Sequence, residues 1–118
     1  VLDAVQKAQG QGCAPGILGV AIGGDRGSSY IKSKEVLFSE MGTPNADPKI
    51  AELEERLTSE ANEMGIGPMG FGGKTTVLDT KIVGLSRLPA SYFVSVSYMC
   101  WAYRRRKMTV RGEEITYD

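Results

Sequence analysis

A glycine-rich stretch from Gly65 to Thr76 constrains this chain more than any other feature of its sequence. Five of the twelve residues are glycine, and the stretch ends in a lysine followed by two threonines. Glycine loses more conformational freedom on folding than any other residue, so this density of glycines argues against a packed helix or a regular strand. A lysine and hydroxyl groups beside exposed backbone are typical of an anion-binding loop. We therefore predict such a loop here.

Two other interpretations of this stretch remain. A phosphate-binding P-loop needs the pattern Gly-x-x-x-x-Gly-Lys-Ser/Thr, and the position five residues before Gly73 is Pro68. A P-loop also follows a strand and opens a helix, whereas the patterns here predict a helix before the stretch and a strand after it. Nucleotide binding is therefore disfavoured. A structural turn that carries a surface lysine is the simpler alternative.

Composition limits the classes of function. Lys and Arg together number 14, as do Asp and Glu, so the charge balance gives no sign of nucleic-acid binding. No run of eighteen apolar residues predicts a membrane span. The chain has no histidine, which removes imidazole bases and His–zinc sites from its chemistry. Two cysteines do not make a disulfide framework, so we expect a reducing, cytoplasmic setting.

Local patterns predict a single mixed α/β domain, with a mixed sheet, flanking helices and a closing β-hairpin. Helices are predicted over residues 2–9, 29–41 and 47–64, and strands over residues 17–22, 76–83, 92–101, 107–110 and 114–117. The strand over residues 17–22 is a short apolar run between glycines, which suits a strand buried on both faces.

Two of the helices carry specific expectations. The helix over residues 47–64 has Asp47 as its N-cap and Pro48 at its first position. Its glutamates are expected to form a solvent-exposed face: Glu52, Glu54, Glu55, Glu60 and Glu63. The helix over residues 29–41 is expected to be capped by Ser28 or Ser29. Its inward side chains are expected to be Tyr30, Val36, Leu37 and Met41.

Cys13 and Cys100 lie 87 positions apart, each beside a segment rich in glycines or strand residues. A lone cysteine is most often a small buried hydrophobic residue. Two thiolates without a third ligand do not complete a zinc or iron–sulfur site. Trp101, next to Cys100, is expected to lie in the core.

Four segments in this order resemble one family of enzymes. They run from Gly12 to Gly24, from Ala51 to Leu57, from Gly65 to Thr76, and from Arg87 to Ala102. Together they resemble the iron–sulfur hydro-lyases, namely class I fumarate hydratase and L(+)-tartrate dehydratase, in the alpha subunit or N-terminal catalytic domain. The resemblance covers about residues 3–106, and its glycine and cysteine motifs are long and specific.

The resemblance implies a [4Fe–4S] cluster held by three cysteines, with one iron left open to act as a Lewis acid on a 2-hydroxy acid. Cys13 and Cys100 match two of the ligands, and the third family cysteine lies upstream of Val1. The family segments that line the substrate site match Gly23, Gly24, Gly73, Lys74 and Thr75. Residues 1–118 would then form one partial domain, the C-terminal portion of the catalytic domain. Its partners would be a small dicarboxylate and a beta subunit or C-terminal domain, in an oligomer.

One position departs from the family pattern. Relatives usually carry a histidine near the Pro-Ala-Ser segment, and this chain has Ser86, Arg87 and Leu88 there. Either Arg87 or Ser86 takes over that role, or the reaction is altered, and Arg87 is the one candidate for a catalytic residue. The basic run Arg104–Lys107 is a solvated turn end, or it steers a dicarboxylate or faces a partner domain.

The expected function is therefore that of a fragment of fumarate hydratase, which interconverts (S)-malate and fumarate. L(+)-tartrate dehydratase is the near alternative, because it shares these motifs. An alternative of another class is a non-catalytic scaffold segment that binds no cluster.

Overall fold

The computed structural model describes residues 1–14 and 16–117. Along the chain, the helical elements are α1 (Leu2–Ala8), η1 (Gln9–Gln11), α2 (Arg26–Glu35), η2 (Val36–Phe38), α3 (Pro48–Glu63), η3 (Pro68–Gly70) and η4 (Trp101–Tyr103). The strands are β1 (Gly16–Gly24), β2 (Val77–Arg87), β3 (Val94–Tyr98), β4 (Met108–Arg111) and β5 (Glu114–Tyr117). The predicted fold class, a mixed sheet with flanking helices and a closing hairpin, is confirmed.

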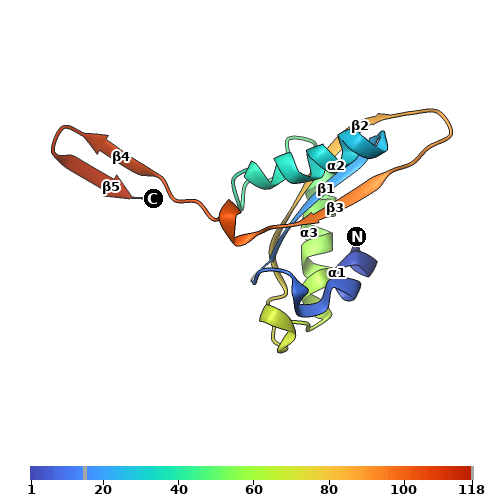
Figure 1. Cartoon of the computed structure of the whole chain (residues 1–118), viewed down its shortest axis with the longest axis horizontal. Helices are drawn as coiled ribbons and strands as arrows, with labels where there is room; N and C mark the ends of the chain where they lie inside the picture. The colour runs from blue at the N-terminus through green and yellow to red at the C-terminus, as the bar shows by residue number, and fades with distance from the viewer. Residues whose placement is uncertain (15, 118) are drawn as a thin grey trace.

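Strand β1 is the centre of a three-stranded sheet of order β2-β1-β3. It pairs in parallel with β2 and antiparallel with β3. Helix α2 lies over one face of this sheet, whereas α3 and α1 lie on the other, so the body has three layers (Figure 1). The apolar core sits between the sheet and the α1–α3 layer and consists of Val5, Leu18, Val20, Leu57, Ala61, Ile66, Val77 and Ile82.

Helix α2 begins earlier than predicted and presents a different face to the sheet. Its N-cap is Asp25, which accepts hydrogen bonds from the backbone N–H groups of Gly27 at 2.7 Å and Ser28 at 2.9 Å. The bond from the Ser28 backbone, with those from the Ser28 hydroxyl and Gly27, holds the pKa of Asp25 below its usual value. The prediction that Tyr30 and Met41 point inward is wrong, because both side chains are more than half exposed.

The buried face of α2 is made of small polar residues. Ser29 and Ser33 are fully buried, and the Ser33 hydroxyl lies 2.7 Å from that of Ser97 on β3. The helix comes so close to β1 that a Cβ atom on Gly19 would lie 2.0 Å from the Ser33 carbonyl oxygen. Leu37, which was expected inward, is buried beside the same glycine. At this distance α2 has no room for large side chains on its inner face, which explains why Tyr30 points outward. Met41 is exposed for a different reason, because it lies in the turn after η2, beyond the end of the helix.

Helix α3 and the terminal hairpin match their predicted positions closely. Asp47 caps α3 by accepting a hydrogen bond from the backbone N–H of Lys49 at 2.9 Å, and Pro48 is the first residue of the helix. Strand β3 is shorter than predicted and ends at Tyr98. In the part of the chain that the structure describes, no helix has both the length and the apolar character needed to cross a bilayer.

Strands β4 and β5 form an arm that stands away from the body (Figure 1). Met108 pairs with Tyr117, and Val110 pairs with Ile115, so these four apolar side chains share one face of the arm. All four are more than half exposed. The arm therefore carries an apolar face that the described body does not cover.

The close contact between α2 and β1 generates a stability prediction. We expect Gly19→Val to lower the free energy of unfolding by about 3 kcal/mol, because the added side chain must displace α2 backbone. Urea unfolding followed by circular dichroism measures the change. Gly84→Ala is the matched control, since its added Cβ would meet its nearest neighbour, Ile50, at an ordinary 3.6 Å. Equal stability of the two variants would contradict the packing described above.

Candidate functional site

The two cysteines lie at the same end of the three-stranded sheet. Cys13 precedes β1, and Cys100 follows β3 by two positions and caps η4. Leu18 pairs with Tyr98, and the backbone N–H of Met99 donates to the carbonyl of Ile17 at 2.9 Å. Because β1 and β3 are antiparallel, the start of one strand meets the end of the other. Both thiols are free, Cys13 half-buried and Cys100 exposed.

The aromatic ring of Tyr98 lines the segment that carries Cys13. A Cβ atom added to Gly12 or Gly16 would lie 2.8 Å or 2.6 Å from this ring, so a side chain at either position would require the ring to move. Burial raises the pKa of Tyr98 above its usual value. A role for Tyr98 was not predicted from the sequence, although it lies only two residues before Cys100.

Trp101 was expected to lie in the core. This prediction is wrong, because 65% of its surface is exposed. It lies in the short η4 turn directly after Cys100. The guanidinium carbon of Arg104 lies 4.1 Å from the centroid of its ring system. A stacked arginine, and not the core, therefore covers part of this side chain.

The glycine-rich stretch is an irregular loop whose backbone needs glycine. All five of its glycines have positive φ angles: Gly65, Gly67, Gly70, Gly72 and Gly73. The neck of the loop closes where the N–H of Gly72 donates to the carbonyl of Ile66 at 2.8 Å. Helix α3 precedes the loop and strand β2 follows it, which is the reverse of a P-loop. Lys74 and Thr75 lie exposed on its outer part.

Asn62, at the end of α3, holds the exit of this loop. Its side-chain oxygen accepts hydrogen bonds from the backbone N–H groups of Thr76 at 2.7 Å and Val77 at 2.9 Å. The buried Thr76 hydroxyl in turn accepts from the N–H of Gly67 at 3.2 Å. These bonds tie both ends of the loop together and leave Lys74 and Thr75 at its surface. Asn62 was not predicted from the sequence as a residue of this site.

The loop and the cysteines occupy one end of the sheet. Strand β2 runs parallel to β1, Gly16 pairs with Val77, and the N–H of Gly16 donates to the carbonyl of Thr76 at 3.4 Å. The loop before β2 therefore lies beside the segment before β1. The predicted residues Gly73, Lys74 and Thr75 share this end with Cys13 and Cys100.

Gly23, Gly24 and Arg87 lie at the other end. Gly24 pairs with Arg87, and the nine residues of β1 make eight steps from Gly16 to Gly24, which is roughly 26 Å at 3.3 Å per step. The structure therefore does not bring these three residues together with the cysteines. The backbone itself explains why both positions are glycine. Both residues have positive φ angles, and a Cβ atom on Gly23 would lie 2.3 Å from the Leu85 carbonyl oxygen.

The donor set for a metal is incomplete within the residues described. Across residues 1–14 and 16–117, no three His, Cys, Asp or Glu side chains come together as a metal site. Thiolates are the usual ligands of iron–sulfur clusters, so Cys13 and Cys100 fit such a cluster by chemistry and by their shared end of the sheet. Two thiolates are one fewer than an open-iron cluster needs.

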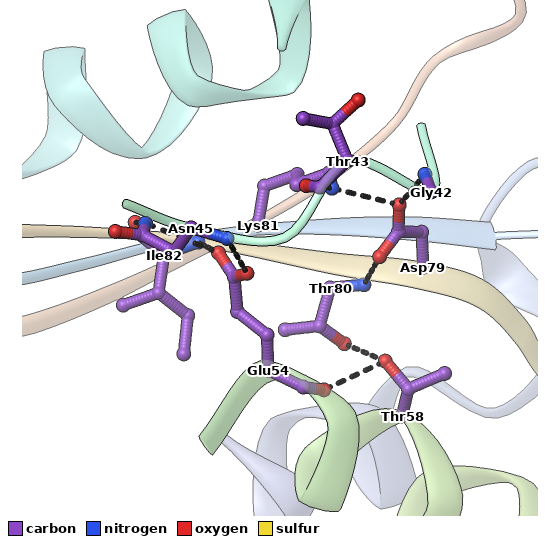
Figure 2. A network of polar contacts seen from close by, with 9 residues as sticks. All are labelled: Gly42, Thr43, Asn45, Glu54, Thr58, Asp79, Thr80, Lys81 and Ile82. Carbon is purple, nitrogen blue, oxygen red and sulfur yellow. Dashed lines mark hydrogen bonds and ion pairs between the residues drawn. The ribbon is translucent and has the colours of Figure 1, made fainter. Parts of the chain in front are cut away.

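A second polar cluster lies along the free edge of β2 and was not predicted (Figure 2). Glu54 was expected on the solvent-exposed face of α3, but it is only 6% exposed. Its carboxylate accepts from the backbone N–H of Ile82 at 2.7 Å and of Asn45 at 3.2 Å. The Asn45 amide donates to the Ile82 carbonyl at 2.8 Å. Glu54 and Asn45 thus occupy both outward backbone groups of Ile82, as a neighbouring strand would.

The same edge holds a buried ion pair. The Lys81 ammonium lies 3.0 Å from the Asp79 carboxylate and donates to the carbonyl of Thr43 at 2.7 Å (Figure 2). Asp79 also accepts from the N–H of Gly42 at 2.9 Å. These bonds fasten the segment after η2 to the sheet. A groove of about 690 Å³ runs between this segment, α3 and β2, and Lys81 and Asp79 lie on its wall.

Comparison with known proteins identifies the family of this chain. The family model described as fumarate hydratase (fumerase) matches residues 1–109. The chain belongs to this family.

Individual relatives agree with the family match. A protein of Geobacillus stearothermophilus named as a class I fumarate hydratase is 52% identical over 105 residues, which cover 89% of this chain and 20% of that protein. Proteins named as L(+)-tartrate dehydratase subunit alpha are 37% identical in Methanocaldococcus jannaschii and 34% identical in Escherichia coli K12. These matches cover 89% and 90% of this chain, and 37% and 35% of the relatives. The chain thus spans between a fifth and two fifths of the length of the relatives it matches.

The anchoring of the loop by Asn62 can be tested directly. We expect Asn62→Leu to lower the free energy of unfolding by about 2 kcal/mol, because two backbone N–H groups lose their acceptor. Hydrogen exchange at Thr76 and Val77 should also become faster. Asn62→Asp is the matched control, because it keeps an acceptor oxygen. In this variant, both amides should keep their protection from hydrogen exchange. Unchanged exchange in Asn62→Leu would show that another group holds the loop.

Proposed function

We propose that this chain forms part of the catalytic site of a hydro-lyase that interconverts (S)-malate and fumarate. One observation carries the proposal: two free thiols and a glycine-rich loop with a lysine lie at one end of a sheet in a fumarate hydratase family chain. The chain would be the C-terminal portion of a larger catalytic domain. The small share of each relative that it covers supports this assignment.

Cys13 and Cys100 would provide two thiolate ligands of a [4Fe–4S] cluster, and the third would come from outside residues 1–118. The donor chemistry supports the assignment, because thiolates at the ends of adjacent strands can bind one cluster. When bound, such a cluster with one open iron supplies a Lewis acid that weakens the C–O bond of a 2-hydroxy acid. The thiols would have to stay reduced, which suits a cytoplasmic setting.

The loop residues would bind a carboxylate of the substrate. Lys74 provides an ammonium group, Thr75 provides a hydroxyl, and both are exposed on a loop held by Asn62. Backbone N–H groups in glycine-rich turns add further donors for an anion. In this proposal, the loop binds and orients the dicarboxylate and does not itself move a proton.

Gly23, Gly24 and Arg87 do not fit the same site within one chain, because about 26 Å separates the ends of β1. Their assignment to the substrate therefore needs a second chain or domain to bring them near a cluster. Arg87 is exposed at that end, beside the turn into α2. Its role as a replacement for the family histidine remains a prediction.

Fumarate is favoured over tartrate by the comparison of identities, 52% to a fumarate hydratase against 37% and 34% to tartrate dehydratases. Tartrate remains the second candidate, because both substrates present carboxylates beside a hydroxyl group. The two tartrate dehydratases are named as alpha subunits, which supports a beta subunit or C-terminal domain as the partner here.

The cluster assignment predicts that neither the isolated chain nor a ligand variant is active. The assembled enzyme, reconstituted with iron and sulfide without oxygen, should convert malate to fumarate and bind four irons per site. Cys13→Ser and Cys100→Ser should each lower this activity by more than the 10- to 100-fold typical of a lost outer-shell partner. The 118-residue chain alone should be inactive, because the site's components act together.

Iron and sulfide content, measured beside activity, separates the alternatives. Full activity and full iron content in Cys100→Ser would overturn the ligand assignment. An assembled enzyme that binds no iron would favour the non-catalytic scaffold. Faster turnover of tartrate than of malate would identify the second candidate.

The role of Lys74 gives a separate prediction. In the assembled enzyme, Lys74→Ala should raise the KM for malate or lower kcat, because a cationic ligand of the carboxylate is lost. Lys74→Arg should keep part of the activity, since it keeps the positive charge while replacing the compact ammonium with a planar guanidinium group. The measurement is the pH dependence of kcat/KM for both variants. Loss of an ionisation from the profile, with Lys74→Arg as inactive as Lys74→Ala, would show that the lysine moves a proton.

A further inference from the structure

Arg104 contacts the neighbours of both cysteines. Its guanidinium carbon lies 4.1 Å from the centroid of the Trp101 ring, and Trp101 directly follows Cys100. One of its terminal nitrogens donates to the carbonyl of Ala14 at 2.5 Å, and Ala14 directly follows Cys13. A single side chain thus connects two segments that lie about ninety residues apart in the sequence.

We propose that Arg104 is a positioning residue that sets the separation between the Cys13 and Cys100 thiols. The inference rests on the proposed function, in which these thiols bind one cluster. Arg104 itself does not bind the cluster or the substrate. It acts by tying the segment before β1 to the turn after β3.

The backbone of η4 transmits this tie to Cys100. The N–H of Tyr103 donates to the carbonyl of Cys100 at 2.9 Å, and the N–H of Arg104 donates to the carbonyl of Trp101 at 3.0 Å. These bonds close a single turn from Cys100 to Arg104, so their backbones move together. The position of the Arg104 guanidinium therefore limits where Cys100 can lie relative to Ala14.

The neighbouring arginine fastens the same turn to a different element. Arg105 donates to the carbonyl of Phe38 in η2 at 2.6 Å, and its guanidinium carbon lies 5.0 Å from the Phe38 ring centroid. The Tyr103 ring packs against Phe38 with a centroid distance of 4.8 Å. Arg105 thus fastens η4 to η2, and among the residues that the structure describes no hydrogen bond joins it to the Cys13 segment, so it provides a matched comparison for Arg104.

The geometry needs an arginine and not just a positive charge. A guanidinium group is planar, so it can stack on an indole ring and donate hydrogen bonds in its own plane at the same time. A lysine ammonium can reach one partner but cannot reproduce both contacts. Arg104→Lys should therefore keep the charge and lose part of the positioning.

The test measures the effective concentration of the two thiols in the cluster-free chain, which contains no other cysteine. The reaction with glutathione disulfide oxidises the two protein thiols to one disulfide and releases two molecules of glutathione. Its equilibrium constant at fixed pH gives the effective concentration. We expect Arg104→Ala to lower it about tenfold, Arg104→Lys to lower it less, and Arg106→Ala, which removes a charge from the same run, to leave it unchanged.

Two further measurements separate positioning from folding. Circular dichroism of Arg104→Ala should match that of the unsubstituted chain, whereas its fluorescence should change, because Trp101 is the single tryptophan. Arg105→Ala should change the effective concentration less than Arg104→Ala. The proposal is overturned if Arg104→Ala behaves like Arg106→Ala, if Arg105→Ala has the larger effect, or if the unsubstituted chain forms no intramolecular disulfide. No cluster is needed, so failure of cluster binding alone would count against the proposed function and not against Arg104.

Discussion

The hydrogen-bonded pairing of β1 with its two neighbours determines where the chemistry of this chain can lie. One neighbour is parallel and the other is antiparallel, so the starts of β1 and β2 and the end of β3 meet at one end of the sheet. The segments attached to those three strand ends carry Cys13, the glycine-rich loop and Cys100. Reversal of either neighbour would separate the two thiols or remove the loop from them. Strand topology, more than any single side chain, therefore assembles this end of the molecule.

Features that depend on neighbouring residues in the sequence were predictable. The cap and first proline of α3 are adjacent residues, and the glycine-rich loop reflects the φ angles of its own backbone. The hairpin of β4 and β5 follows from alternation around Gly112. In each case, the energy that selects the structure comes from the segment itself.

Features that depend on contacts between distant segments were not predictable in this way. Helical periodicity placed Tyr30 and Met41 inward, but the close approach of α2 to Gly19 leaves room only for small side chains on that helix, and the helix ends at Glu35, before Met41. In a helix rich in glutamate, the sequence pattern places Glu54 on the surface. Its burial depends on the backbone N–H of Ile82, which, in the part of the chain that the structure describes, has no neighbouring strand on that side and donates to Glu54 instead. The shared end of the sheet for Cys13 and Cys100 was expected from the family resemblance. The separation of Gly23 and Gly24 from them became clear only with the strand register.

The side chains that occupy the outer edge of β2 also limit how this sheet can grow. Glu54 and Asn45 use the outward backbone groups of Ile82, and the Asp79 carboxylate accepts from the N–H of Thr80 at 2.8 Å. Strand β3, at the other edge, has no comparable side-chain caps on its backbone among the residues that the structure describes. An added strand, from a partner or from elsewhere in a longer chain, would therefore have to displace these side chains at residues 80–82 of β2, whereas it would meet no such caps along the described part of β3. Growth beside β3 would widen the sheet on the side of the strand that leads to Cys100.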